Sequence, residues 1–302
     1  MTTHSLAGIY VAAATPLKAD YSPDYAAIPG LLDFLAKRGA HGALLLGTTG
    51  EGTSFSPPER EQIWQHALEV RQAHPDFKLL AGTGTPSLAE SRDLTQTAFD
   101  LGFDGVMVLP PYYYRTASQD GLYRWFETLL STAVPSDGAL FGYHIPKVSG
   151  VSFSIELLQR LRAAFPDQFV GIKDSSGDIE HTRQVLEAMD TDFAVLVGSD
   201  RVLSQALSFG GSGCITAYAN VASPQLRAIW DAHQDGKPTA EIQAQIDTAR
   251  EIIDQFGLYP PSIKALLSEV YGFPRWPLRP PLDALTDEQT AELLTAIQPY
   301  LP

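Results

Sequence analysis

The sequence predicts an α/β fold, a (β/α)8 TIM barrel followed by a C-terminal helical region. Short apolar runs recur at a spacing of roughly 30 residues with helical patterns between them, and eight such runs fit within the first 218 of 302 residues. The runs are unbroken rather than alternating, which is typical of parallel strands buried on both faces. About 220 residues of this alternation suit a barrel. A doubly wound open sheet is the alternative.

The predicted strands are short and mostly aliphatic. Amphipathic segments such as residues 56–74 and 87–102 lie between them and are expected to be helices. Serine precedes four of these helical segments, as is typical of a helix N-cap: Ser56, Ser87, Ser118 and Ser154. The strands are expected over residues 8–15, 42–48, 78–85, 105–110, 140–146, 169–174, 193–199 and 212–218.

The rest of the chain is expected to be helical without strands. Two helical patterns end at Gly257 and Gly272, a proline-rich segment follows, and residues 286–301 form a last helix. We therefore predict two parts, a barrel with the active site over 1–224 and a helical region over 225–302. The second part is expected to pack beside the barrel or against a neighbouring subunit.

Composition excludes several classes of function. The chain carries 21 Lys and Arg against 35 Asp and Glu, a net charge of −14 without a basic cluster, so neither nucleic acid nor an anionic membrane is an expected partner. One cysteine, Cys214, fits a reducing cytoplasm. No signal peptide is expected, and no apolar stretch reaches the roughly 18 residues of a membrane span. The seven histidines are scattered without metal-ligand spacing, so no metal or cofactor is expected.

Lys173 is the most informative candidate because reactive groups in a barrel lie at the carboxyl ends of the strands. In "FVGIKD" strand alternation places Lys173 on the same face as Gly171, which leaves room for an inward-pointing amine. Burial disfavours the charged form of an amine, and a neutral amine can attack a ketone to form a Schiff base. The alternative is a lysine at the strand end that forms an ion pair with Asp174.

Tyr143 follows another predicted strand, "LFGYHIP", on the same face as Phe141. A phenol beside a Schiff-base lysine can carry protons to and from the reacting oxygen. The alternative is a core aromatic residue whose hydroxyl bonds to the backbone. The next residue, His144, points to the opposite face and is expected to pack against a helix.

The stretch "GTTGEG" over 47–52 ends the second predicted strand. Thr48 and Thr49 offer hydroxyls and backbone N–H groups in a tight turn, which forms a nest for a small anion such as a carboxylate. Glu51 is expected to brace this turn. A plain strand-to-helix turn is the alternative, and without the lysine of a P-loop no nucleotide binding is expected.

Four motifs, taken together and in this order, resemble the dihydrodipicolinate synthase and N-acetylneuraminate lyase family of class I, pyruvate-dependent aldolases. The resemblance spans nearly the whole chain and implies a barrel, a helical C-terminal region and a homotetramer built as a dimer of dimers. The motifs are "GTTGE" (47–51), "YHIPKVSG" (143–150), "GIKDSSGD" (171–178) and "GSDRVLSQALSFGGSGCITAYANV" (198–221).

The resemblance also implies a role for each matching residue. Lys173 would form the Schiff base with pyruvate or another 2-oxo acid, and Tyr143 would carry protons. Thr48 and Thr49, with Gly47 in the same turn, would hold the carboxylate.

Further roles are implied at the other matching positions. Tyr113, in "PPYYYR", would reach the neighbouring subunit's site and complete a proton relay with Thr48 and Tyr143. Ile215 would place a backbone carbonyl near the keto acid. Ser199 and Asp200 would contact substrate hydroxyls, with a structural turn as the alternative.

Two departures from the family pattern bear on the substrate. Val148 stands where the synthases usually carry an arginine, and Ala217 stands where the sialic acid lyases carry a serine. We therefore predict a Schiff-base lyase, aldolase or dehydratase that acts on pyruvate and a hydroxylated 2-oxo acid such as a 2-keto-3-deoxy sugar acid. The alternatives are 4-hydroxy-tetrahydrodipicolinate synthase, which condenses pyruvate with aspartate semialdehyde, and a catalytically silent keto-acid-binding protein.

Overall fold

The computed structural model describes residues 4–302. Eight strands form a closed barrel in chain order, with parallel pairing between neighbours, so the predicted fold class is confirmed. The strands are β1 (Gly8–Ala12), β2 (Gly42–Leu45), β3 (Lys78–Gly82), β4 (Gly105–Val108), β5 (Leu140–His144), β6 (Phe169–Asp174), β7 (Ala194–Val197) and β8 (Gly213–Thr216).

All eight predicted strands are present, and most end earlier than the sequence predicts. The second strand, expected to reach residue 48, ends at Leu45 because Leu46 adopts a left-handed backbone conformation with φ of 58°. The apolar run continues past this point, but the backbone has already left the ladder and begun a loop. Hydrophobicity alone therefore overestimates the length of strands that lead into loops.

The chain divides into two compact units. The first contains Met1–Gly8 and Lys78–Cys214, and the second contains Ile9–Phe77 and Ile215–Pro302. The predicted boundary between 224 and 225 lies inside helix α9 (Ala219–Gln234) and remains a prediction.

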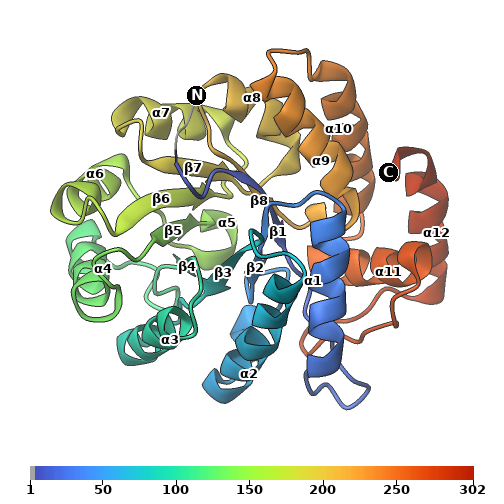
Figure 1. The fold of residues 1–302 in the computed structure, drawn as a ribbon, viewed down its shortest axis with the longest axis horizontal. Coiled ribbons are helices and arrows are strands. Elements are labelled where there is room, and N and C mark those ends of the chain that lie inside the picture. Colours follow the sequence, from blue (N-terminus) through green and yellow to red (C-terminus); the bar gives the residue numbers. More distant parts are fainter. Residues whose placement is uncertain (1–3) are drawn as a thin grey trace. The chain divides into compact units, whose positions relative to one another are not determined.

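In the first unit, helices α3, α4 and α6 lie outside the strands β3–β6 (Figure 1). Their start points follow from side-chain capping, because Ser87, Ser118 and Ser154 each accept a hydrogen bond from a backbone N–H of the first turn, as predicted. Asp178 does the same for α7. The helices are α3 (Leu88–Asp100), α4 (Gln119–Ala133), α5 (Pro146–Ser149), α6 (Ile155–Ala164), α7 (Ile179–Ala188) and α8 (Leu203–Ser208), with the 3-10 turn η4 (Asp200–Val202).

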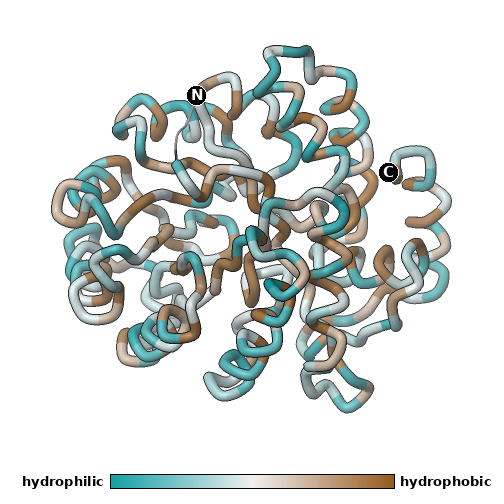
Figure 2. The backbone as a smooth tube through the Cα atoms, in the orientation of Figure 1, coloured by the Kyte–Doolittle hydropathy of each residue, from teal (hydrophilic) through white to brown (hydrophobic). Residues whose placement is uncertain are grey.

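The helices are amphipathic, and hydrophobic and hydrophilic residues alternate along them (Figure 2). Helix α4, for example, buries Leu122, Phe126 and Leu129 and leaves its other face to solvent. None of the helices among residues 4–302 combines the length and the apolar character that crossing a membrane would require.

In the second unit, Ser56 begins α2 through a capping box, in which its backbone N–H donates to the Glu59 carboxylate. Helix α10 ends at Asp254, three residues before the predicted end at Gly257, whereas α11 ends at the left-handed Gly272 as predicted. Helix α10 contacts α9, α11 and α12. The helices are α1 (Ile28–Lys37), α2 (Pro57–Ala67), α9, α10 (Ala240–Asp254), α11 (Tyr259–Tyr271) and α12 (Asp287–Ile297), with the 3-10 turns η1 (Tyr25–Ala27), η2 (Gly52–Ser54), η3 (Leu68–Gln72) and η5 (Gln298–Tyr300).

Candidate active site

Lys173 and Tyr143 lie opposite each other on neighbouring strands of the first unit. They are partners in the register of β5 and β6, and their side chains are 3% and 6% exposed. The Lys173 Nζ lies 4.2 Å from the centre of the Tyr143 ring, which is the geometry of a cation–π contact. The structure thus brings together the amine and the phenol that the sequence singles out.

Gly171 explains why this face of β6 has space. It pairs with Phe141 on β5, and a Cβ atom at position 171 would lie 2.3 Å from the Ala194 carbonyl oxygen and 2.7 Å from the Phe141 ring. Only glycine therefore fits below Lys173, as the strand pattern predicts.

Asp174 does not pair with Lys173 in the described part of the chain, so the alternative interpretation of Lys173 as the ion-pair partner of Asp174 is excluded there. Its carboxylate accepts hydrogen bonds from His181 Nδ1 at 2.9 Å, from the Thr182 hydroxyl at 2.8 Å and from the Ser176 N–H at 2.9 Å. Burial alone would raise the pKa of Asp174, but the bonds from His181 and Ser176 outweigh it and lower the pKa.

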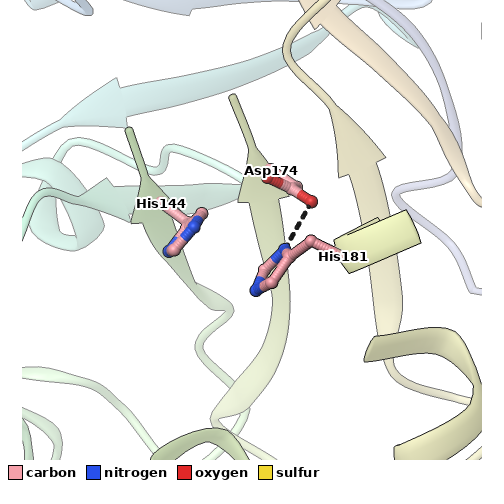
Figure 3. Close-up of side chains that lie close together, drawn as sticks. All are labelled: His144, Asp174 and His181. Atoms are coloured by element: carbon pink, nitrogen blue, oxygen red, sulfur yellow. Dashed lines mark hydrogen bonds and ion pairs between the residues drawn. The ribbon is translucent and has the colours of Figure 1, made fainter. Parts of the chain in front are cut away.

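His144 completes a cluster with Asp174 and His181 that the sequence analysis missed (Figure 3). The two imidazole rings are stacked, with centroids 4.5 Å apart and planes 10° apart, so His144 does pack against a helix as expected. The signal for the cluster was available, because His181 follows the helix cap Asp178 by three residues and therefore lies on the first turn of α7.

The side chains of this cluster are of types that bind transition metals, and one ligand-type atom from each lies within 4.8 Å of the others. Their arrangement argues against a shared metal. Imidazole lone pairs lie in the ring plane, and parallel stacked rings do not aim them at one point. Both Nδ1 atoms are also engaged, His181 with Asp174 and His144 with the Phe153 N–H at 3.2 Å.

The turn after β2, in the second unit, has the form of an anion nest. The Glu51 N–H donates to Thr48 O and the Gly52 N–H to Gly47 O, while among residues 4–302 the N–H groups of Thr49 and Gly50 meet no acceptor. Thr49 is only 4% exposed, whereas the Thr48 side chain reaches solvent. Adjacent unpaired amides beside a hydroxyl suit a carboxylate.

Glu51 fixes the backbone of this turn. It has a left-handed conformation with φ of 55°, which is uncommon for a residue with a side chain. The next residue, Gly52, lies so close to Leu46 that a Cβ there would be 1.9 Å from the Leu46 carbonyl oxygen. Such a backbone needs support from outside the turn.

That support comes from the C-terminal helical region. Glu51 Oε1 accepts from Lys264 Nζ at 2.6 Å, and Glu51 Oε2 accepts from the Arg279 backbone N–H at 2.8 Å. Lys264 also donates to the Pro277 carbonyl at 2.7 Å. Both side chains of the ion pair are buried. Burial lowers the pKa of Lys264, and the Glu51 carboxylate opposes this effect.

The Arg279 guanidinium extends the brace to the start of α2. It donates to the Ser54 carbonyl at 2.6 Å and forms an ion pair with Glu59. Hydrogen bonding to Arg279 is the main cause that lowers the pKa of Glu59 to about 2. The sequence predicts that Glu51 braces the turn, but not which groups bind its carboxylate. A lone lysine in the apolar run "PPSIKALL" was the available signal for a buried charge pair.

We expect Lys264→Met to lower the free energy of unfolding by about 3–5 kcal/mol, because removing one partner leaves the buried Glu51 carboxylate uncompensated. Urea unfolding measures this change. Lys37→Met is the control, since the Lys37–Asp33 pair lies on the surface of α1 and contributes about 0.5 kcal/mol or less. Glu51→Gln combined with Lys264→Met should cost less than the sum of the single changes. A loss below about 1 kcal/mol for Lys264→Met alone would contradict the brace.

The other predicted site residues are placed as follows. Tyr113 is 76% exposed and packs edge-on against Tyr114. Ile215 is fully buried in β8, Ser199 is partly exposed, and Asp200 is fully buried at the start of η4. The burial of Asp200 favours the structural turn over a contact with substrate.

Val148 lies in the short helix α5 and is 56% exposed. Near it lie two cationic side chains that the motifs do not single out. The side chain of Arg115 lies against Gly150, where a Cβ would be 2.7 Å from Arg115 Cδ, and Lys147 approaches Gly177 with 4.0 Å between its Nζ and a Cβ built there. Two cationic side chains of the first unit therefore approach the loops that follow β5 and β6.

A closed parallel barrel with a buried lysine at the carboxyl end of β6, facing a tyrosine of β5, defines an enzyme of the class I aldolase type. The profile of the dihydrodipicolinate synthetase family matches residues 5–299. The chain belongs to this family and is a class I, Schiff-base-forming, pyruvate-dependent aldolase or lyase.

Relatives and solved structures agree with this assignment. An uncharacterized DapA-like lyase of Chloroflexus aurantiacus is 38% identical over 96% of this chain and 96% of its own length. The 4-hydroxy-tetrahydrodipicolinate synthase of Methanosphaerula palustris is 31% identical over 97% and 99%. Among solved structures, YagE, a prophage protein of the dihydrodipicolinic acid synthase family from E. coli K12 in complex with pyruvate, has a TM-score of 0.91 at 26% identity, with 98% of each chain covered.

Proposed function

We propose that the enzyme is a lyase, aldolase or dehydratase that acts on pyruvate and a hydroxylated 2-oxo acid such as a 2-keto-3-deoxy sugar acid. The observation that carries the proposal is the buried Lys173 amine, 4.2 Å from the centre of the Tyr143 ring. Nζ attacks the keto carbon of the 2-oxo acid, water leaves from the carbinolamine, and the imine withdraws electrons from the bond that breaks or forms. This mechanism invokes no cofactor.

The other residues divide the work of binding and proton transfer. The Tyr143 hydroxyl carries a proton to the departing carbinolamine oxygen. Thr48 and Thr49 hold the carboxylate. The backbone N–H groups of Thr49 and Gly50, which have no acceptor within residues 4–302, support this role. Gly47 belongs to the same turn, and Ile215 offers its backbone carbonyl to the keto acid.

The exposed aromatic pair of Tyr113 and Tyr114 supports a contact between subunits. We propose that Tyr113 reaches a neighbouring subunit in a homotetramer and completes a proton relay with Thr48 and Tyr143 there. Sedimentation of Tyr113→Ser tests this: a variant that keeps both the oligomeric mass and the turnover of the wild type would contradict the proposal.

The preference for a hydroxylated substrate rests on position 148. Condensation with aspartate semialdehyde requires a group that binds a second carboxylate, which an arginine does with two charge-assisted hydrogen bonds. Valine cannot do so. Neutral donors and acceptors, which the partly exposed Ser175 and Ser199 carry, suit a polyhydroxyl chain instead.

One observation favours the synthase as a second candidate. Arg115 lies against Gly150, close to the position where the family's arginine would stand, and relatives at 31% identity are named 4-hydroxy-tetrahydrodipicolinate synthase. The single guanidinium of Arg115 would then replace the contact that Val148 lacks.

A substrate panel decides between the two candidates. Losing one charged contact costs about 1.5–3 kcal/mol, or roughly 10–150-fold in specificity. We therefore expect kcat/KM for condensation of pyruvate with aspartate semialdehyde to fall below that for cleavage of 2-keto-3-deoxy sugar acids, sialic acid or 4-hydroxy-2-oxoglutarate. If the semialdehyde gives the highest value and Arg115→Met lowers it selectively, the synthase replaces our first candidate.

A further inference from the structure

We propose that His144, Asp174 and His181 are positioning residues that clamp the carboxyl ends of β5 and β6 and thereby hold the Tyr143 ring against the Lys173 amine. This inference rests on the proposed function and deepens it. The three side chains have no role in the mechanism described above, although they adjoin both of its central residues.

The strand register places the cluster beside the pair of Tyr143 and Lys173. Tyr143 pairs with Lys173, and the next pair along the same two strands is His144 with Asp174. Successive side chains point to opposite faces of a strand. The cluster therefore lies directly behind the reactive pair, and any shift of one pair along the strands moves the other.

The hydrogen bonds show what the cluster connects. Asp174 binds two residues of α7, His181 and Thr182, and His144 accepts from the backbone of Phe153 in the segment before α6. The stacked rings of His144 and His181 then connect the end of β5 to α7 (Figure 3). Two strands, one helix and one loop are thus held together by four side chains.

The charges suit this arrangement only while His144 is neutral. Burial lowers the pKa of His144 to about 4, so the ring is neutral at higher pH. The hydrogen bond from the Phe153 N–H to Nδ1 then places the remaining ring proton on Nε2. The hydrogen bond to Asp174 raises the pKa of His181. Asp174 raises the pKa of both rings, the neighbouring His181 lowers that of His144, and Asp178, just before α7, raises that of His181.

The sign of the pH effect follows from these values. Because the pKa of His144 is lower in the folded than in the unfolded state, the clamp loses stability as the pH falls from 6.5 toward 4. A proton on His144 removes the acceptor for the Phe153 N–H and places a second cation in the stack. The non-titrating variant His144→Asn, whose amide oxygen can still accept, should not show this loss.

The test measures the rate of borohydride-trapped imine formation with pyruvate, its pyruvate dependence and the melting temperature. His181→Leu should lower the rate at saturating pyruvate by about 10–100-fold, because small misplacements of reacting groups have effects of this size. The half-saturating pyruvate concentration should change by less than about threefold, since the carboxylate nest is untouched. His181→Asn, whose amide can donate to Asp174, should restore most of the rate.

Gln184→Leu is the matched control on α7, because Gln184 is exposed and, in the described part of the chain, its side chain donates only to Glu180 of its own helix. It should match the wild type. As a second readout, the ratio of the wild-type rate to the His144→Asn rate should fall as the pH falls from 6.5 toward 4, even if His181→Leu fails to fold.

Three results would overturn the inference. A folded His181→Leu enzyme with wild-type rates would show that the clamp does not position the reactive pair. Zinc at micromolar concentration that raises the melting temperature of the wild type but not of His181→Asn would make the cluster a metal site. A wild-type enzyme that forms no imine at all would instead contradict the proposed function, and this inference with it.

Discussion

Lys173→Met is expected to abolish the borohydride-trapped adduct with pyruvate and to reduce turnover by roughly 10³-fold or more, because a covalent mechanism loses its nucleophile. The methionine keeps an unbranched apolar chain in the buried site, so the barrel should remain folded. Mass mapping of the wild-type adduct should place it on the peptide that contains residue 173. Intact-protein mass spectrometry and steady-state kinetics measure both effects.

Two other lysines serve as controls for this result. Lys147 is exposed in α5, and Lys147→Met should trap pyruvate like the wild type. Lys264 is buried, but its amine is already bound by the Glu51 carboxylate at 2.6 Å and by the Pro277 carbonyl at 2.7 Å, so we expect no adduct there. An adduct on either of these lysines, or none with any 2-oxo acid, would refute the mechanism.

Tyr143→Phe should slow turnover by about 10²–10⁴-fold, the usual cost of losing a proton-transferring group. The ring remains, so its contact with the Lys173 Nζ at 4.2 Å should remain as well. Retention of pyruvate should therefore survive, and kcat should fall much more than KM rises. Steady-state kinetics with equilibrium trapping of pyruvate separate the two quantities.

Tyr114→Phe is the control, because this phenol is exposed and, among residues 4–302, its ring stacks edge-on against Tyr113 alone. It should leave turnover within a few-fold of the wild type. Near-normal turnover of Tyr143→Phe would reduce Tyr143 to a packing residue and leave the proton carrier unassigned.

Local patterns in the sequence predicted the strands and the reactive pair. Lys173 and Tyr143 were found because each ends an apolar run, and strand alternation then gave the face on which each side chain lies. The same reasoning placed His144 on the opposite face. These placements need only neighbouring residues, and the structure agrees with them, whereas the catalytic roles of Lys173 and Tyr143 stay predictions.

Contacts between distant segments could not be read in this way. The partner of Asp174 depends on how the loop after β6 folds back to bring His181 to the carboxylate. The partners of Glu51 come from another part of the chain, and no periodicity links "GTTGE" to Lys264. In both cases the sequence located the carboxylate, and only the fold showed that it is buried and which groups bind it.

The brace on Glu51 has a consequence for synthesis of the chain. Its carboxylate is bound by groups 213 and 228 residues later, and synthesis proceeds from the N-terminus. The turn that is proposed to hold the substrate carboxylate therefore stays unfinished on the ribosome until Arg279 has emerged. Chains released before that point would carry Lys173 and Tyr143 and still lack a completed recognition turn. Completion of this turn thus couples the proposed capacity to bind a 2-oxo acid to translation as far as residue 279.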